Sequence, residues 1–347
     1  MALSRSTRPP EREPSCLSTV SLCYHRTLRS RSKSLVSAFG RMSDSAPSPS
    51  IPPPPTGASR KPPESPRRAL WQAASFSVLL YVGWMLLAGL FQPRLEWFAG
   101  TRFSFRLLSY YLSLDGFALG LSAAYLCVLD GDSFAALGLR FHSRWFRQAL
   151  AGMAWGAGVI SATALLLSLF RAAAFPSLAP SSLPHFVLLA SFLFLAAAFE
   201  ELTFRGYALQ RVSQACGPVV AAGVSSALFG FAHYGNPQAT LLSTLNTALA
   251  GVLLAVARLR SRALWMPIGL HFAWNLFLGP VFSFPVSGYA FGAGKTSAPP
   301  AVPPWLSGGA YGPEGSAALT GILAAAILLL LRLPLPMASN GSHSEVD

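Results

Sequence analysis

The chain has 347 residues, of which 52% are hydrophobic and only 11% are charged. Soluble globular proteins carry about 25% charged residues, so the composition excludes an ordinary soluble domain and predicts an all-α protein that crosses a membrane several times. The net charge of +13 is assigned to membrane topology rather than to nucleic-acid binding, because Lys and Arg gather beside apolar spans on the cytoplasmic side. The four cysteines show neither metal-ligand spacing nor a disulfide framework: Cys16, Cys23, Cys127 and Cys216.

The first 68 residues differ in composition from everything that follows. Residues 1–68 are rich in Ser, Pro and Arg and hold 12 of the 26 Lys and Arg residues, with Pro at four consecutive positions, 52–55. Such a segment cannot bury a core and is predicted to be a disordered tail. Met42 offers an alternative start, and the choice between Met1 and Met42 stays open. Residues 336–347 are predicted to form a second, C-terminal tail, which leaves 69–335 as the membrane domain.

Eight apolar segments follow the tail. A transmembrane helix needs about 20 apolar residues, with a range of about 17–25, and the segments approach or reach this length. We therefore expect about eight transmembrane helices, of which the fifth and eighth are the shortest. The segments are 69–91, 107–129, 148–170, 183–205, 217–234, 238–257, 263–282 and 316–333.

Basic residues alternate between the loops that join these segments. Loops after even-numbered segments and the stretch before the first are rich in Arg, whereas most of the other loops hold one basic residue or none; the loop at 92–106 is the exception. Positive charge marks the cytoplasmic side. The pattern predicts a multi-pass protein of the cell membrane with both termini in the cytoplasm.

Two adjacent acids, Glu200 and Glu201, end the apolar run that begins near Leu183. An ionisable residue at membrane depth is by default a functional-site hypothesis; the alternative is that the run stops at Phe199 and the pair marks a wet helix end. Glu201 and Arg205 are four residues apart and share a helix face, with the acid first, which is the favourable order. Glu200 points about 100° away from Glu201. We predict that Arg205 holds Glu201 while Glu200 is free to act.

Two further polar pairs occur on later apolar segments. They are Phe229-x-x-x-His233 and His271-x-x-x-Asn275. Counted from the turn near Gly217, the acid pair and His233 lie about sixteen residues away on either side, which is about 20–25 Å at about 1.5 Å per residue if both helices are continuous. His271 lies about ten residues past the loop at 258–262, which is about 15 Å by the same rise per residue. We expect these groups to meet in a membrane-embedded cavity that admits water, with Asn246 lining it.

The residue types indicate hydrolysis of an amide bond without a Ser or Cys nucleophile. A carboxylate near an imidazole can activate water as a general base, and a His or Asn donor can stabilise the tetrahedral oxyanion. Zinc is the competing interpretation, since His and Glu are zinc ligands. The chain has no HExxH, and the ligand-like residues come singly from separate helices, so we expect no metal and no other cofactor.

Taken singly, several of these residues could have purely structural roles. Phe229 is expected to be a packing residue, and Asn275 could bridge two helices. Asp115, inside the second apolar segment, could belong to a polar site, but a satisfied helix–helix contact is the favoured expectation. The combination of motifs, in this order and on separate segments, is what favours a catalytic site.

At these residues the sequence resembles the CPBP family, also called the Abi or CAAX-protease family, whose pattern is EExxxR, FxxxH and HxxxN. The segment from Asp132 to Arg140 resembles one that many bacterial members carry, and the segment from Gly308 to Gly315 resembles a bacterial loop before the last helix. The resemblance covers roughly 130–335, with the protease core at about 183–282. It implies a bacterial inner-membrane location.

The resemblance implies an intramembrane glutamic endopeptidase that needs no metal. In its terms, Glu200 activates water with His233 as partner, His271 and Asn275 stabilise the oxyanion, and Glu201 and Arg205 support them. The implied partners are membrane lipids and a peptide or protein substrate, with or without a lipid group; CAAX-box proteins are the eukaryotic example. The alternative function is a non-proteolytic membrane adaptor or a bacteriocin self-immunity protein. A small transporter fits poorly, because no duplicated halves are visible.

Overall fold

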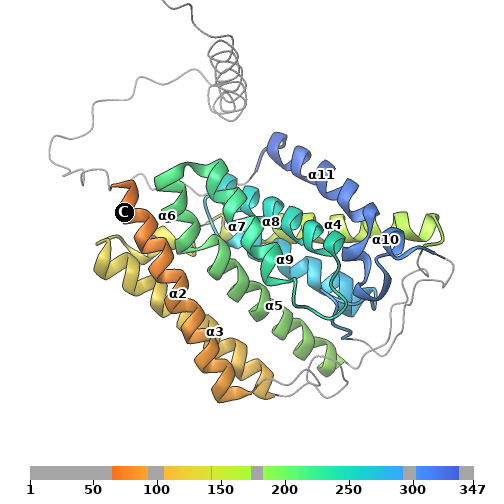
Figure 1. Cartoon of the computed structure of the whole chain (residues 1–347), viewed down its shortest axis with the longest axis horizontal. Coiled ribbons are helices and arrows are strands. Elements are labelled where there is room, and N and C mark those ends of the chain that lie inside the picture. Colours follow the sequence, from red (N-terminus) through yellow and green to blue (C-terminus); the bar gives the residue numbers. More distant parts are fainter. Residues whose placement is uncertain (1–64, 93–104, 142, 173–182, 292–301, 336–347) are drawn as a thin grey trace, which may run out of the picture. The chain divides into compact units, whose positions relative to one another are not determined.

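The computed structural model describes residues 65–92, 105–141, 143–172, 183–291 and 302–335 (Figure 1). The described part is helical and contains no β-strand, which confirms the predicted all-α class. Most of the tail predicted at 1–68 and the tail predicted at 336–347 lie outside the described residues, so those two predictions stay predictions.

Each of the eight apolar segments contains a helix. Two of these helices continue into a turn of π-helix: α3 (Phe105–Ala123) into Ala124–Leu129, and α9 (Trp265–Leu276) into Phe277–Val281. Short 3-10 turns lie at Phe134–Leu137, Gly309–Tyr311 and Pro313–Gly315. The α-helices are α2 Pro66–Phe91, α3 Phe105–Ala123, α4 Trp145–Leu169, α5 Leu183–Arg205, α6 Tyr207–Cys216, α7 Pro218–Ala232, α8 Leu241–Ser261, α9 Trp265–Leu276, α10 Pro304–Ser307 and α11 Ala317–Arg332.

Five helical stretches in the described part are long and apolar enough to cross a membrane: Pro66–Phe91, Phe105–Leu129, Trp145–Leu169, Leu183–Cys216 and Leu241–Ser261. The other three predicted segments are helical but shorter, since α7 has 15 residues, α9 has 12 and α11 has 16. A span normally needs about 17–25 residues. The structure therefore supports a membrane protein with five clear spanning candidates, and the full count of eight stays a prediction.

The fourth apolar segment, predicted at 183–205, forms a helix with those bounds, and the chain does not continue as the same helix up to the turn near Gly217. Helix α5 ends at Arg205, and a separate helix α6 begins at Tyr207. Gly206 between them has no room for a side chain, because a Cβ there would collide with the Leu202 carbonyl. The equal-depth estimate was conditional on continuous helices, and the break at Gly206 means that this condition is not met. The side chains of the site are brought together by the packing of their helices.

Helices α4 and α9 pack closely because glycines remove side chains from their contact. A Cβ at Gly152 or Gly156 of α4 would collide with backbone carbonyls of α9, and a Cβ at Gly269 would collide with one of α4. Small residues spaced in this way let helix backbones approach within a membrane. This contact fixes the position of α9, which carries His271.

The segment that follows α3 ties several helices together. Asp130 accepts hydrogen bonds from Gln72 of α2, at 2.7 Å, and from Arg211 of α6. Arg258 of α8 donates to the Leu137 carbonyl at 3.3 Å. Asp130 and Arg211 form a buried ion pair, and the buried Arg258 is hydrogen-bonded to a backbone carbonyl, which reduces the cost of burying these charges. The segment thereby links α2, α6 and α8 at one end of the helices.

Candidate active site

The six side chains proposed from the sequence come from three helices. Glu200, Glu201 and Arg205 lie on the last two turns of α5. His271 and Asn275 lie one turn apart on α9. The FxxxH spacing predicted that His233 would lie within a helix. In the structure it lies just past the end of α7, as the residue that caps the C-terminus of that helix.

Glu201 is the buried centre of a charge network. Its Oε1 lies 3.1 Å from Nη1 of Arg205 and 2.9 Å from Nδ1 of His271, and both Glu201 and Arg205 are fully buried. Arg205 also donates to the Gly251 carbonyl of α8 at 3.2 Å, and its guanidinium stacks over the ring of Phe229 at 4.2 Å. The network therefore joins α5, α7, α8 and α9.

Glu200 lies outside this network. Its side chain is 27% exposed, and its Oε2 lies 3.7 Å from Nε2 of His233 and 3.8 Å from Nε2 of His271. These distances are too long for direct hydrogen bonds, and Oε2 has no other hydrogen-bond partner among the described residues. One carboxylate oxygen therefore faces two imidazole nitrogens across a gap.

Hydrogen bonds at the other ring nitrogens orient both imidazoles. Nδ1 of His233 lies 2.8 Å from the carbonyl oxygen of Phe229, and a carbonyl can only accept. Nδ1 of His271 faces the carboxylate of Glu201, which is paired with Arg205 and also accepts. Both Nδ1 atoms therefore carry a hydrogen, and both Nε2 atoms are directed at Glu200.

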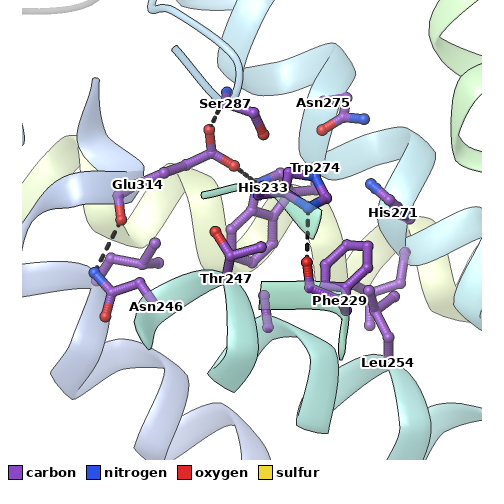
Figure 2. Close-up of a pocket in the computed structure, with 13 residues that line it drawn as sticks. Phe229, His233, Asn246, Thr247, Leu254, His271, Trp274, Asn275, Ser287 and Glu314 are labelled. Carbon is purple, nitrogen blue, oxygen red and sulfur yellow. Dashed lines mark hydrogen bonds between the residues drawn. The ribbon is translucent and has the colours of Figure 1, made fainter. Parts of the chain in front are cut away.

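A cavity of about 30 Å³ borders the two histidines (Figure 2). This volume accommodates about two water molecules. Its polar lining comes from α7, α8, α9 and two loops. The polar lining residues are His233, Asn246, Thr247, His271, Asn275, Ser287 and Glu314.

Asn246 lines this cavity, as expected, but its side-chain amide makes hydrogen bonds that hold neighbouring segments together. Its Nδ2 donates to the backbone carbonyls of Glu314 and Ser316, both at 2.9 Å, and its Oδ1 accepts from Thr320 at 2.7 Å. The side chain therefore ties α8 to the loop before α11 and to α11 itself.

Glu314 is a site residue that the sequence analysis did not single out. It is only 7% exposed, its Oε1 accepts from the indole of Trp274 at 2.8 Å, and its Oε2 accepts from the backbone N–H of Ser287. Burial raises the pKa of Glu314, while these two donors act in the opposite direction. A signal was present in the sequence, because a lone acid in a Gly-rich loop is unusual in a chain with 13 acids.

Phe229 and Asp115 were expected to have structural roles, as a packing residue and in a helix–helix contact. Phe229 is buried, with its ring centroid 4.6 Å from that of His233 and 5.9 Å from that of His271, which agrees with a packing role. Asp115 is 6% exposed, and neither carboxylate oxygen has a hydrogen-bond partner among the described residues. The expectation of a satisfied helix–helix contact at Asp115 was wrong.

Glu200 and the two histidines that face it provide the donor types of a catalytic zinc site, namely one carboxylate and two imidazoles. Among the described residues, however, no group of three or more His, Cys, Asp or Glu side chains is arranged to hold a metal ion.

Comparison with known proteins identifies the part of the chain that carries this site. Residues 180–277 match the family model described as Rce1-like, type II CAAX prenyl endopeptidase Rce1-like. No curated protein and no solved structure matches the chain. The matched residues contain all three motifs and every candidate catalytic side chain named from the sequence. Residues 180–277 are thus similar to the type II CAAX prenyl endopeptidase family, which supports the resemblance to the CPBP, or CAAX-protease, family over this part of the chain.

Proposed function

We propose that this protein is a glutamic-type intramembrane endopeptidase that hydrolyses a peptide bond with a water molecule activated by Glu200. The observation that carries the proposal is the convergence of one Glu200 oxygen and two Nε2 atoms across gaps of 3.7 and 3.8 Å. A polar gap of this length is suited to a single bridging water. The Rce1-like domain supports protease chemistry at the same residues.

In this mechanism Glu200 acts as the general base and His233 assists it. The fixed Nδ1–H of His233 leaves its Nε2 as an acceptor when the ring is neutral. The water can therefore direct its two hydrogens at Oε2 of Glu200 and at Nε2 of His233. General-base catalysis of this kind contributes about 10²–10⁴-fold to a rate.

His271 and Asn275 supply the electrophilic side of the site. To donate from Nε2, His271 must carry hydrogens on both nitrogens, because its Nδ1–H is already directed at Glu201. The Glu201 carboxylate stabilises that imidazolium. The Asn275 amide borders the same cavity and offers a second donor to the oxyanion, an interaction that is worth about 10²–10³-fold where measured in other hydrolases.

The substrate is proposed to be a peptide or protein segment that reaches the site from the membrane or its cytoplasmic surface. The family description names CAAX prenyl endopeptidases, so prenylated CAAX peptides are the first class to test. Surrounding lipids are the expected second partner, because the apolar helices expose large side chains such as Leu86 and Leu90 of α2.

The decisive experiment compares membrane peptides from cells that produce the wild-type chain with those from cells that produce Glu200→Gln. Glu200→Gln should abolish the cleavage products while the protein still accumulates. Asp132→Asn is the matched control, because it makes the same acid-to-amide change at a side chain that is 48% exposed and lies outside the site. Identical peptides from wild type and Glu200→Gln would favour the non-proteolytic adaptor or immunity function instead.

A further inference from the structure

The carboxylate of Glu314 faces the cavity from a loop outside the matched domain, whereas Glu200 is not among the residues that line the cavity (Figure 2). Glu314 lies in the 3-10 turn Pro313–Gly315, beyond residue 277 where the family match ends. Its two oxygens accept from Trp274 and from the Ser287 amide. This contact joins α9 to two loops that follow it in the chain.

The contact with Trp274 bears directly on the catalytic turn of α9. Trp274 immediately precedes Asn275 and follows His271 by three residues, so the three side chains belong to one helical turn. Residues at this spacing keep fixed relative directions in a helix. Anchoring the indole at 2.8 Å from Glu314 therefore limits rotation of the turn that presents His271 and Asn275.

Glu314 can serve as an anchor because its own backbone is held. The Asn246 amide donates to the Glu314 carbonyl at 2.9 Å. Gly308 has a φ of +89°, and a Cβ there would collide with the Gly312 carbonyl, so the loop folds back tightly on itself. The carboxylate is therefore presented from a constrained loop that is tied to α8.

We propose that Glu314 is a positioning residue of the hydrolytic site: through Trp274 it holds His271 and Asn275 at the angle needed to stabilise the oxyanion. This inference rests on the function proposed above. It assigns a functional role to the loop before α11, whose residues lie outside the matched domain. A displacement of about 1 Å at a catalytic group can cost about a hundredfold in rate, so the loss of this anchor should appear in kcat.

The variants are Glu314→Gln, Trp274→Phe and the double variant. Gln keeps the shape of Glu but offers one acceptor to two N–H donors, and Phe removes the indole donor while filling most of its space. Tyr125→Phe is the control, because it removes a hydrogen bond, Tyr125 to Ser75 at 3.0 Å, from a ring that is 7% exposed and is not among the residues that line the cavity.

Full-length protein in detergent is assayed with a farnesylated CAAX peptide as the probe, and kcat and KM are compared at equal amounts of folded enzyme. Each single variant should lower kcat about tenfold or more and change KM by less than about threefold. The kcat of the double variant should equal that of the single variant with the lower kcat, because both substitutions break the same contact. Multiplied losses, or a kcat for Glu314→Gln within twofold of wild type, would overturn the proposal.

A spectroscopic measurement separates this inference from the proposed function. In protein with ¹⁵N-labelled His and Trp, the ring signals of His271 should shift in Glu314→Gln and in Trp274→Phe but not in Tyr125→Phe. Unchanged His271 signals in both site variants would refute the positioning role even if peptides are cleaved. If Glu200→Gln cleaves normally, the hydrolytic function fails, and the His271 signals still report whether Glu314 orients α9. Should one variant not fold, the other carries the test.

Discussion

Glu200 and Glu201 are neighbours in the chain, but their carboxylates lie in different surroundings. Glu201 is fully buried and paired with Arg205 and His271, whereas Glu200 is 27% exposed and faces two Nε2 atoms. A helix turns about 100° between adjacent residues, and this turn separates the two environments. The same substitution should therefore have different consequences at the two positions.

We predict that Glu200→Gln lowers turnover about 10²–10⁴-fold, the contribution of a general base, and leaves the unfolding temperature within a few degrees of wild type. Glu201→Gln should instead destabilise the protein by about 3–5 kcal/mol, because it leaves the buried Arg205 charge uncompensated. Turnover of a farnesylated peptide and thermal unfolding in detergent measure the two effects. Normal turnover in Glu200→Gln would contradict the assignment of the base.

Glu200 and the two histidines also allow a prediction of how a metal chelator affects turnover. We predict that incubation with EDTA or 1,10-phenanthroline leaves turnover within about twofold of the untreated enzyme, because the proposed base, assistant and oxyanion donors are all side chains. Turnover before and after dialysis provides the measurement. A loss that added Zn²⁺ restores would show that the histidines and Glu200 hold a metal.

At the scale of elements, the contact between α4 and α9 sets the position of His271. We predict that Gly156→Ala lowers stability by about 1–3 kcal/mol, the usual cost of overpacking, because its Cβ would collide with a backbone carbonyl of α9. Turnover should fall as well, since α9 must move. Gly158→Ala on the same helix is the control, because nothing lies within 4 Å of a Cβ there. Equal unfolding temperatures for the two variants would disprove the role of this contact.

The sequence was sufficient to locate the helices and to group the side chains of each motif. Apolar length located a helix in every segment, and the spacing of four placed Glu201 beside Arg205. It could not reveal the separate helix α6 directly after Gly206 or the end of α7 before His233, because both depend on contacts between helices. The Arg205 carbonyl at the end of α5, for example, accepts from Arg258 of α8 at 3.2 Å.

Other features were harder to find for a physical reason. Gly152 and Gly156 lie four residues apart on α4, but nothing in the sequence identifies α9 as the helix that they contact. Glu314 meets Trp274 across 40 positions in the chain, and no periodicity relates a loop residue to a helix residue at that separation. The site was therefore predictable where its members share a helix and hidden where a loop closes over it.

At the scale of the whole molecule, basic residues at the ends of helices predict the direction of insertion. Arg258 and Arg260 lie in the last turn of α8, and Arg332 lies in the last turn of α11. Positive charge marks the cytoplasmic side, so we predict that a cysteine placed at Arg262 reacts with an impermeant thiol reagent only after the membrane is opened. Labelling in intact cells would reverse the assigned orientation.

Helix α7 has 15 residues, which is about 22 Å at 1.5 Å per residue, whereas the hydrocarbon core of a bilayer is about 30 Å thick. His233 sits at the very end of this short helix, while Glu200 belongs to the longer α5. A change in acyl-chain length tilts short and long helices differently, and it should therefore alter the gap between the base and its assistant. In vesicles of graded chain length, the hydrolytic rate should pass through a maximum, so that the lipid composition of the host membrane sets the enzyme's working speed.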